Sequence, residues 1–314
     1  MTVPDERRAL IRAMPWVFVL IWSTGFVVAR YGMPHAPPLT FLSLRYALSV
    51  LCFGVWIALA RAAWPRGRTQ WAHLAVTGVL MQAGYLGGVW AAIKHGIAAG
   101  TVSLIVGLQP VLTALWVSFA ASRRRHANTV TAGQWLGLLL GLAGLVLVVW
   151  RKLGVGEVNA LNFGLSLLAL VAITVGALYQ KRHVAPCDVR TASCVQMLAA
   201  LAVSLPFSLL ERERLVWHPE LIGALVWSVL VLTLGGSSLL FILLQRGAAT
   251  RVTSLFYLVP PCTALMAWLL FGELLTPVVL AGMALAALGV WLAVRTPVAP
   301  PAPPRPIPMK GEIP

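Results

Sequence analysis

The sequence predicts an all-α integral membrane protein with ten transmembrane helices, arranged as two inverted five-helix repeats. Three observations predict this fold: an apolar composition, ten segments of membrane-spanning length, and an internal repeat. Of the 314 residues, 59% are hydrophobic and only 11% are charged, whereas soluble domains carry about a quarter charged residues. One water-soluble core cannot bury that much apolar surface, so we expect the lipid bilayer to be the main partner of this chain.

Ten apolar segments follow one another along the chain, each close to the roughly 20 residues that cross the hydrocarbon of a bilayer. Backbone groups in hydrocarbon have no water to bond, so they must bond within their own segment, and we expect every segment to be a helix. The segments are residues 15–33, 38–60, 71–93, 97–120, 132–150, 160–180, 191–210, 219–243, 252–272 and 276–294.

The basic residues predict the orientation of the chain and argue against a nucleic-acid partner. The formal net charge is +15, but the Lys and Arg residues lie in small loop clusters instead of on one polar face, so no nucleic-acid binding is expected. With the N-terminus inside, 17 of the 24 Lys and Arg residues fall in the tails and cytoplasmic loops, six fall on the opposite side, and Arg45 lies within the second segment. The positive-inside rule therefore predicts that both termini are cytoplasmic.

The two halves of the chain repeat each other. A shift of 151 residues places KHGIAAGTVSLIVGLQP, which ends at Pro110, on QRGAATRVTSLFYLVPP, which ends at Pro261, and it also pairs Gly25 with Gly176. A shift of 145 residues aligns the fifth segments, pairing Gly144 with Gly289. Because each half contains an odd number of spans, the second half must enter the membrane in the opposite sense to the first.

The repeat predicts three regions. Residues 1–155 form the first repeat and residues 156–296 form the second. Residues 297–314 contain eight prolines in eighteen positions, a composition that cannot continue a helix, and we expect a disordered cytoplasmic tail.

Inverted repeats favour transport as the function. Two similar halves of opposite orientation can exchange conformations, which gives inward-open and outward-open states of comparable energy around one central site. A duplication that only stabilises a bundle is the alternative, as are an integral-membrane enzyme and a non-transporting scaffold.

An enzyme needs converging acids, nucleophiles or metal ligands, but the six histidines are spread one to a loop or helix end and the four cysteines show no metal-site spacing. No metal and no cofactor are expected, and a monomer is the simplest assembly.

Four stretches of the sequence resemble the drug/metabolite transporter superfamily, EamA-like family. They are WSTGFVVARYG from residue 22, FLSLRY from residue 41, GTVSLIVGLQPVLTALW from residue 100 and VTSLFYLVPPCTALMAWLLFGELLT from residue 252. The resemblance implies a multi-pass exporter in the inner membrane of a bacterial cell, with a central cavity lined by the first four helices of each half and the fifth helices at the periphery. It also implies a small-molecule substrate of amino-acid, nucleoside or drug type, without fixing which one.

Polar and aromatic side chains inside the segments are candidates for the lining of that cavity, because hydrocarbon penalises them on an outward face. In the third segment, Gln82 and Tyr85 share a helical face with Gly78 and Val89. Each candidate also fits interhelical packing or a position at the membrane interface. The candidate substrate-binding residues are Trp22, Gln82, Tyr85, Gln109, Tyr179, Ser254 and Tyr257.

Two prolines and two charged residues are candidates for gating or structural roles. Pro110 and Pro261 occupy equivalent places in the fourth and ninth segments, where a missing amide donor favours either a static kink or a moving hinge. Arg45 needs a partner, and we expect either a structural clamp to loop carbonyls, reached by extending toward the outer boundary, or a substrate or gating role. Glu273 ends the ninth segment and is expected to pair with the start of the next helix, near Thr276.

The positions of the acidic residues constrain the substrate. All nine Asp and Glu residues fall in tails, loops or the ends of segments, whereas a cation exporter driven by protons would need a carboxylate at mid-membrane. The sequence therefore predicts a neutral, zwitterionic or anionic substrate.

Overall fold

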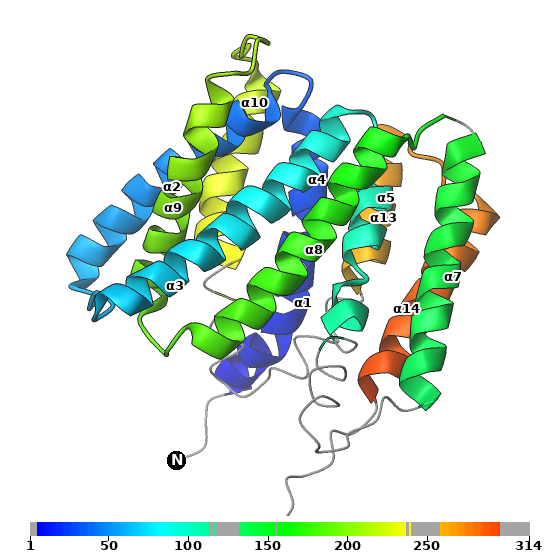
Figure 1. Cartoon of the computed structure of the whole chain (residues 1–314), viewed down its shortest axis with the longest axis horizontal. Helices are drawn as coiled ribbons and strands as arrows, with labels where there is room; N and C mark the ends of the chain where they lie inside the picture. The colour runs from blue at the N-terminus through cyan, green and yellow to red at the C-terminus, as the bar shows by residue number, and fades with distance from the viewer. Residues whose placement is uncertain are drawn as a thin grey trace, which may run out of the picture.

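A computed structural model describes residues 5–113, 132–154, 156–236 and 258–295, together with the isolated positions 116 and 239. Within these residues the regular secondary structure is helical throughout (Figure 1). The elements are α1 (Asp5–Gly32), α2 (Pro38–Ala60), α3 (Arg68–Gly78), η1 (Val79–Gly84), α4 (Tyr85–Lys94), α5 (Ala99–Val106), α7 (Ala132–Gly154), α8 (Ala160–His183), α9 (Val189–Ser208), α10 (Pro219–Val226), η2 (Trp227–Gly236), α13 (Val259–Phe271) and α14 (Pro277–Arg295).

The structure confirms an all-α membrane protein. Six of the described helical runs are long and apolar enough to cross a bilayer, and four shorter apolar helices accompany them. Each of these runs falls on one of the ten predicted segments. Large apolar side chains such as Leu59 and Trp150 face outward, with 81% and 77% of their surface exposed, as expected for a surface solvated by lipid.

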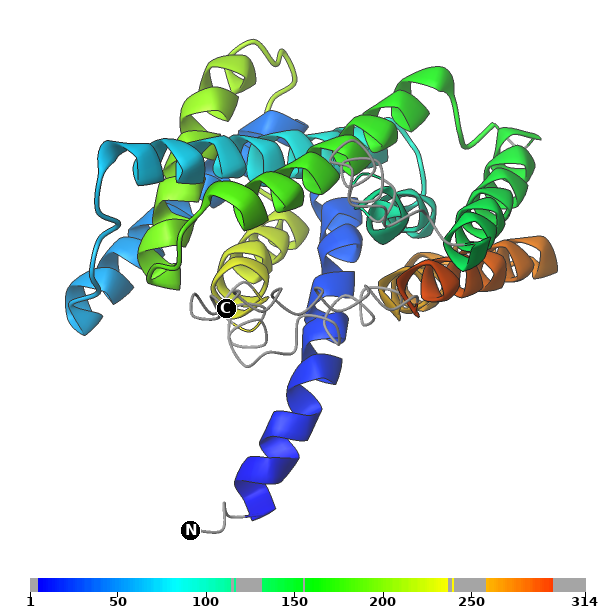
Figure 2. The same ribbon diagram turned by 60° about the horizontal axis from the view of Figure 1, so that its bottom comes forward.

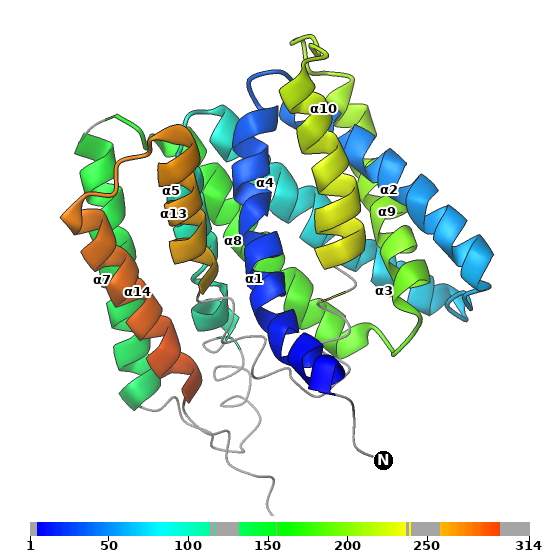
Figure 3. The same ribbon diagram turned by 180° about the vertical axis from the view of Figure 1, so that it is seen from behind.

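The helices pair as an inverted repeat predicts. The second helices of the two halves, α2 and α9, lie side by side, as do the fourth helices α5 and α13 and the fifth helices α7 and α14 (Figures 1 and 3). The first helix of each half contacts the third helix of the other half, since α1 packs on η2 and α8 packs on η1. These reciprocal contacts place the polar segments of both halves around one centre.

Helices α7 and α14 form a separate pair at one side of the bundle (Figure 2). Their glycines meet backbone to backbone: a Cβ atom added at Gly144 would lie 2.4 Å from the Gly282 carbonyl oxygen, and one added at Gly289 would lie 2.4 Å from the Gly141 amide nitrogen. The glycines of the predicted fifth and tenth helices are therefore a packing face within the chain.

The third helix of each half contains a π-helical segment. Segment η1 lies between α3 and α4, and segment η2 continues α10. The 151-residue shift places Val79–Gly84 inside η2, so both halves depart from α-helical geometry at the same place in the repeat. π-Helical turns leave backbone groups that need other partners and are frequent at functional sites.

Pro110 interrupts the fourth helix as expected for a proline inside a span. Helix α5 ends at Val106, the residue whose carbonyl the Pro110 ring would crowd, and the chain resumes helical geometry at Gln109 after a two-residue turn. Pro261 lies in the first turn of the described helix α13, preceded by a 3₁₀ residue at Leu258. Pro110 therefore stands at a break in its helix, and Pro261 stands in the first turn of the described part of its helix.

Polar contacts tie the loops together at the upper end of the bundle in Figure 1, which we define as residues 33–37, 95–98, 156–159, 209–218 and 272–276. Glu211 accepts hydrogen bonds from the backbone amides of Leu39 and Thr40 at the start of α2. Lys94 pairs with Glu213 at 2.5 Å. These contacts join the first half to the second half.

Candidate functional site

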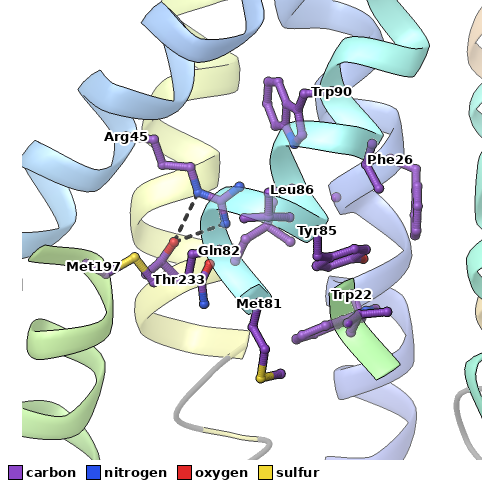
Figure 4. A pocket seen from close by; sticks show the side chains of 14 residues that line it. Trp22, Phe26, Arg45, Met81, Gln82, Tyr85, Leu86, Trp90, Met197 and Thr233 are labelled. Carbon is purple, nitrogen blue, oxygen red and sulfur yellow. Dashed lines mark hydrogen bonds between the residues drawn. The ribbon is translucent and has the colours of Figure 1, made fainter. Parts of the chain in front are cut away.

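A pocket opens at the centre of the bundle, between the two halves (Figure 4). About 650 Å³ of its space is not filled by protein atoms, and part of that space is open to solvent. Its walls come from the first three spans of each half. The lining residues are Trp22, Gly25, Phe26, Arg45, Met81, Gln82, Tyr85, Leu86, Val89, Trp90, Ile173, Met197, Leu232 and Thr233.

The lining follows the repeat. The 151-residue shift relates Trp22 to Ile173, Met81 to Leu232 and Gln82 to Thr233, and both members of each pair line the pocket. Gln82 lies in η1 and Thr233 lies in η2, so the two π-helical segments meet the pocket at equivalent positions.

Arg45 is the charged residue of the described lining. Its side chain extends from α2 to the centre of the site (Figure 4) and is 6% exposed. The guanidinium Nε and Nη2 donate hydrogen bonds of 3.3 and 3.1 Å to the Thr233 hydroxyl oxygen. That hydroxyl in turn donates to the Ser228 carbonyl at 2.8 Å, five residues earlier in η2. The clamp to loop carbonyls that was one expectation for Arg45 is therefore wrong, because the side chain turns inward to a hydroxyl.

The π-helical segment η1 is held by a second buried residue of α2. Tyr46 is fully buried, and its hydroxyl donates a 2.8 Å hydrogen bond to the Gln82 carbonyl. Successive residues of α2 thus reach the two π-helical segments, Tyr46 contacting η1 and Arg45 contacting η2. The arrangement fixes the backbone from which Gln82 extends its amide into the pocket.

The structure brings three of the seven predicted substrate-binding residues together. Trp22, Gln82 and Tyr85 line the pocket. Gln109 lies beyond the break in the fourth helix, where its carbonyl accepts a bond from Thr113, and it is not part of the described lining. Ser254 and Tyr257 lie outside the described residues.

Tyr179 is placed elsewhere. Its hydroxyl lies 2.8 Å from the Nδ1 atom of His73, at the lower end of α8 and α3, and its ring packs against that of His183 with a tilt of 30°. The expectation that Tyr179 lines the pocket is therefore not met in this arrangement, because the residue joins α8 to α3 below the site.

Glu273 contacts a different helix from the one expected. Its carboxylate accepts a 3.2 Å hydrogen bond from the Ala99 amide in the first turn of α5, while Thr276 itself caps α14 by accepting from the Val279 amide. Glu157 accepts from the Ala98 amide, so carboxylates from two loops satisfy free amides at the start of α5. Burial raises the pKa of Glu273, and the nearby charge of Glu157 acts in the same direction.

The histidines are less isolated in space than in the sequence. His35 and His218 stack with ring centroids 4.3 Å apart at the upper end, where Glu220 lies 2.9 Å from the Nε2 atom of His35. The donor atoms of these three residues lie within 4.8 Å of one another, which would suit a metal ion. The sequence places these histidines one to a loop or helix end, and the fold brings His35 and His218 together.

Sequence reasoning missed Thr233, Met81, Met197, Phe26 and Trp90. Thr233 could have been predicted, because the 151-residue repeat aligns it with the candidate Gln82. The apolar members gave no signal, because Met and Phe are the ordinary content of a membrane span. Their role follows only from the packing of six spans around one space.

Comparisons with known proteins agree with this architecture. The sequence pattern of the EamA-like transporter family matches residues 14–150 and 162–295. A Salmonella typhimurium protein named "Probable amino-acid metabolite efflux pump" is 27% identical over 88% of this chain and 92% of its own length. The "Uncharacterized transporter YvbV" of Bacillus subtilis is 25% identical over 92% of both chains.

A solved structure supports the fold. A protein crystal structure of 19% sequence identity superposes with a TM-score of 0.63, covering 89% of this chain and 94% of that one. Together with the family match over most of the chain, the repeated spans and their central pocket show that this multi-pass membrane protein belongs to the EamA-like transporter family.

Proposed function

We propose that this protein exports a small amino-acid-like solute by alternating access, using the pocket between its two halves as the substrate site. The observation that carries the proposal is the pocket itself, which is lined by repeat-related residues of both halves. A site built from two oppositely oriented copies can open to either face when the halves exchange conformations. The names of relatives from Salmonella typhimurium and Escherichia coli, probable amino-acid metabolite efflux pumps, support an amino-acid metabolite as the cargo.

In this proposal the lower end of the bundle and both termini lie in the cytoplasm, and the upper end faces the outside. The excess of Lys and Arg in the loops of the lower end supports this orientation. Pro110 and Pro261 act as hinges of the fourth helices, because the helix breaks before Pro110 and the repeat places Pro261 at the equivalent position. The protein works as a monomer, with α7 and α14 paired within one chain.

Transport can be tested with purified protein in liposomes loaded with a mixture of labelled amino acids and their metabolites. Passage of a labelled solute above that of protein-free liposomes is expected, and Gln82→Ala should lower its rate about 10-fold or more by removing a polar contact in the pocket. The variant Gly164→Ala is a matched control, because a methyl group there meets no atom within 4 Å. Chemical alteration of the solute would indicate an enzyme, and absence of any passage would refute export.

A further inference from the structure

We propose that Arg45 selects the substrate by binding a carboxylate, so that the pocket takes amino acids and related small carboxylic acids that carry an apolar side group. The inference rests on the proposed transport function and names the substrate class of the same site. Its basis is a buried cation in the pocket with an incomplete set of partners.

The positive charge of Arg45 has no carboxylate partner among the described residues. Its hydrogen bonds go to the neutral hydroxyl of Thr233. The six described acidic side chains are engaged elsewhere, in contacts with Lys152, Arg190, the start of α2, Lys94, His35 and the start of α5. The segments 114–131 and 237–257 contain no Asp or Glu in their sequence.

A buried guanidinium that lacks a carboxylate partner in the described part of the protein indicates an anionic ligand. Removing a charge from water costs several kcal/mol unless a partner compensates it, and intramembrane arginines are rare for that reason. Arginine has five N–H donors, of which Thr233 takes one from Nε and one from Nη2. The Nη1 atom and the second Nη2 hydrogen have no partner in the described part of the chain. This is the edge that matches a carboxylate with two parallel hydrogen bonds.

Thr233 is a positioning residue for this arginine. Its hydroxyl is fixed by donating to the Ser228 carbonyl, a bond across five residues that the π-helical geometry of η2 provides. Both lone pairs of the hydroxyl oxygen therefore remain to accept from Arg45. The contact holds one edge of the guanidinium against the second half of the chain and leaves the other edge for a ligand.

The remainder of the lining specifies the rest of the ligand. Trp22, Phe26, Met81 and Met197 form an apolar wall suited to a hydrocarbon or aromatic side group. Gln82 and Tyr85 are the further polar side chains that face the same space. With no acidic side chain in the described lining, an amine without a carboxylate would meet the like charge of Arg45.

Four compounds that share one apolar group separate the contribution of the carboxylate to binding from that of the amine. L-Leucine has a carboxylate and an amine, 4-methylpentanoate has the carboxylate only, L-leucinamide replaces the carboxylate by an amide, and 3-methylbutylamine lacks it. Apparent dissociation constants are measured from the tryptophan fluorescence of the detergent-purified protein, and efflux is measured from proteoliposomes. We expect the two carboxylates to bind at least 10-fold more tightly than the amide and the amine. A ratio of this size corresponds to the free energy that charge-assisted hydrogen bonds contribute.

Variants assign that preference to Arg45. Arg45→Met should remove the preference for carboxylates, lowering the affinity for them by about 10- to 100-fold. Arg45→Lys keeps the charge and should retain part of the preference. Thr233→Val should weaken the preference and Thr233→Ser should preserve it. Arg66→Gln, at an exposed loop position, is the matched control. Thermal unfolding of each variant checks the fold, and the two Thr233 variants carry the test if Arg45→Met is unfolded.

The outcomes separate this inference from the proposed function. If proteoliposomes move solutes but show no preference for carboxylates, or if Arg45→Met keeps the preference, the role of Arg45 is refuted and transport stands. If no compound in this set or in the wider labelled mixture crosses the membrane, export itself is refuted. A preference that disappears in Arg45→Met and persists in Arg66→Gln supports the inference.

Discussion

Tyr46 shows how one hydroxyl supports an irregular helix inside a membrane. The residue is fully buried and donates to the Gln82 carbonyl, which lies in a segment whose hydrogen bonds depart from the α-helical pattern. We predict that Tyr46→Phe lowers the free energy of unfolding by about 1–3 kcal/mol, because a buried carbonyl loses its side-chain donor. It should also reduce transport by allowing Gln82 to shift.

The measurement is thermal unfolding of the detergent-solubilised protein together with efflux from liposomes. Tyr31→Phe is the matched control, since the Tyr31 ring packs on Phe271 and its hydroxyl has no hydrogen-bond partner among the described residues. Equal stability of Tyr46→Phe and Tyr31→Phe would contradict the assigned role.

Glu273 makes a pH-dependent contribution to stability. Burial raises the pKa of its carboxyl group above the ordinary 4.5. At pH values between 4.5 and the raised pKa, the native state therefore binds more protons than the unfolded state. Stability from this group is therefore present below pH 4.5 and is lost as the pH rises through the raised pKa. Glu273→Gln should keep an acceptor for the Ala99 amide without this dependence.

We predict that the unfolding temperature of the wild type falls relative to that of Glu273→Gln as the pH is raised from 4 to 8. Glu273→Ala should be less stable than both at every pH, by about 1 kcal/mol, because the amide of Ala99 loses its acceptor. A difference between wild type and Glu273→Gln that stays constant with pH, or that changes in the opposite direction, would count against the raised pKa.

At the scale of elements, the pairing of α7 with α14 depends on the absence of side chains at its glycines. We predict that Gly144→Leu destabilises the protein by about 1–3 kcal/mol, because its Cβ atom would lie 2.4 Å from the Gly282 carbonyl oxygen and the helices must separate. Gly223→Ala, where a Cβ atom meets nothing within 4 Å, should be neutral or slightly stabilising. Thermal unfolding of the two variants is the test, and equal effects would refute the close approach.

The elements also show what the sequence can and cannot predict. Segment length, apolar composition and the 151-residue repeat were enough to predict the spans and their division into two repeats, because the bilayer leaves few alternatives. The π-helical turns at Gln82 and Thr233 were not predictable, since no residue type or spacing marks them in the sequence. Arg45 could be singled out by its charge, but its partner depended on knowing that η2 faces α2.

The site was predicted in part, on the basis of residue type. Trp22, Gln82 and Tyr85 were found because they are polar or aromatic in an apolar setting. Tyr179 satisfied the same rule, yet it lies near the end of its helix, where His73 offers a partner. Residue type therefore indicates which side chains avoid lipid, whereas position along the span decides whether they reach the pocket.

At the scale of the whole molecule, the contacts of the upper end hold the two halves together on one side of the pocket. His35 of the first half lies against Glu220 of the second, and the Val216 amide donates to the His35 carbonyl at 2.8 Å. Lys94 and Glu213 add an ion pair across the same boundary. Such exposed pairs are individually weak, worth about 0.2–1 kcal/mol, which suits an end that separates in the transport cycle we propose.

Alternating access predicts that a covalent link across this boundary stops transport. We expect His35→Cys/Val216→Cys, made in a chain whose four native cysteines are replaced, to form a disulfide on oxidation, because the backbone hydrogen bond from Val216 to His35 brings the two main chains close enough for a disulfide to join them. Efflux from proteoliposomes should fall to the level of protein-free liposomes when the pair is oxidised and recover on reduction. Each single-cysteine variant under the same oxidant is the control. Full transport by the oxidised, linked protein would mean that the upper end does not open, and a two-state exchange of the halves could then not move the solute.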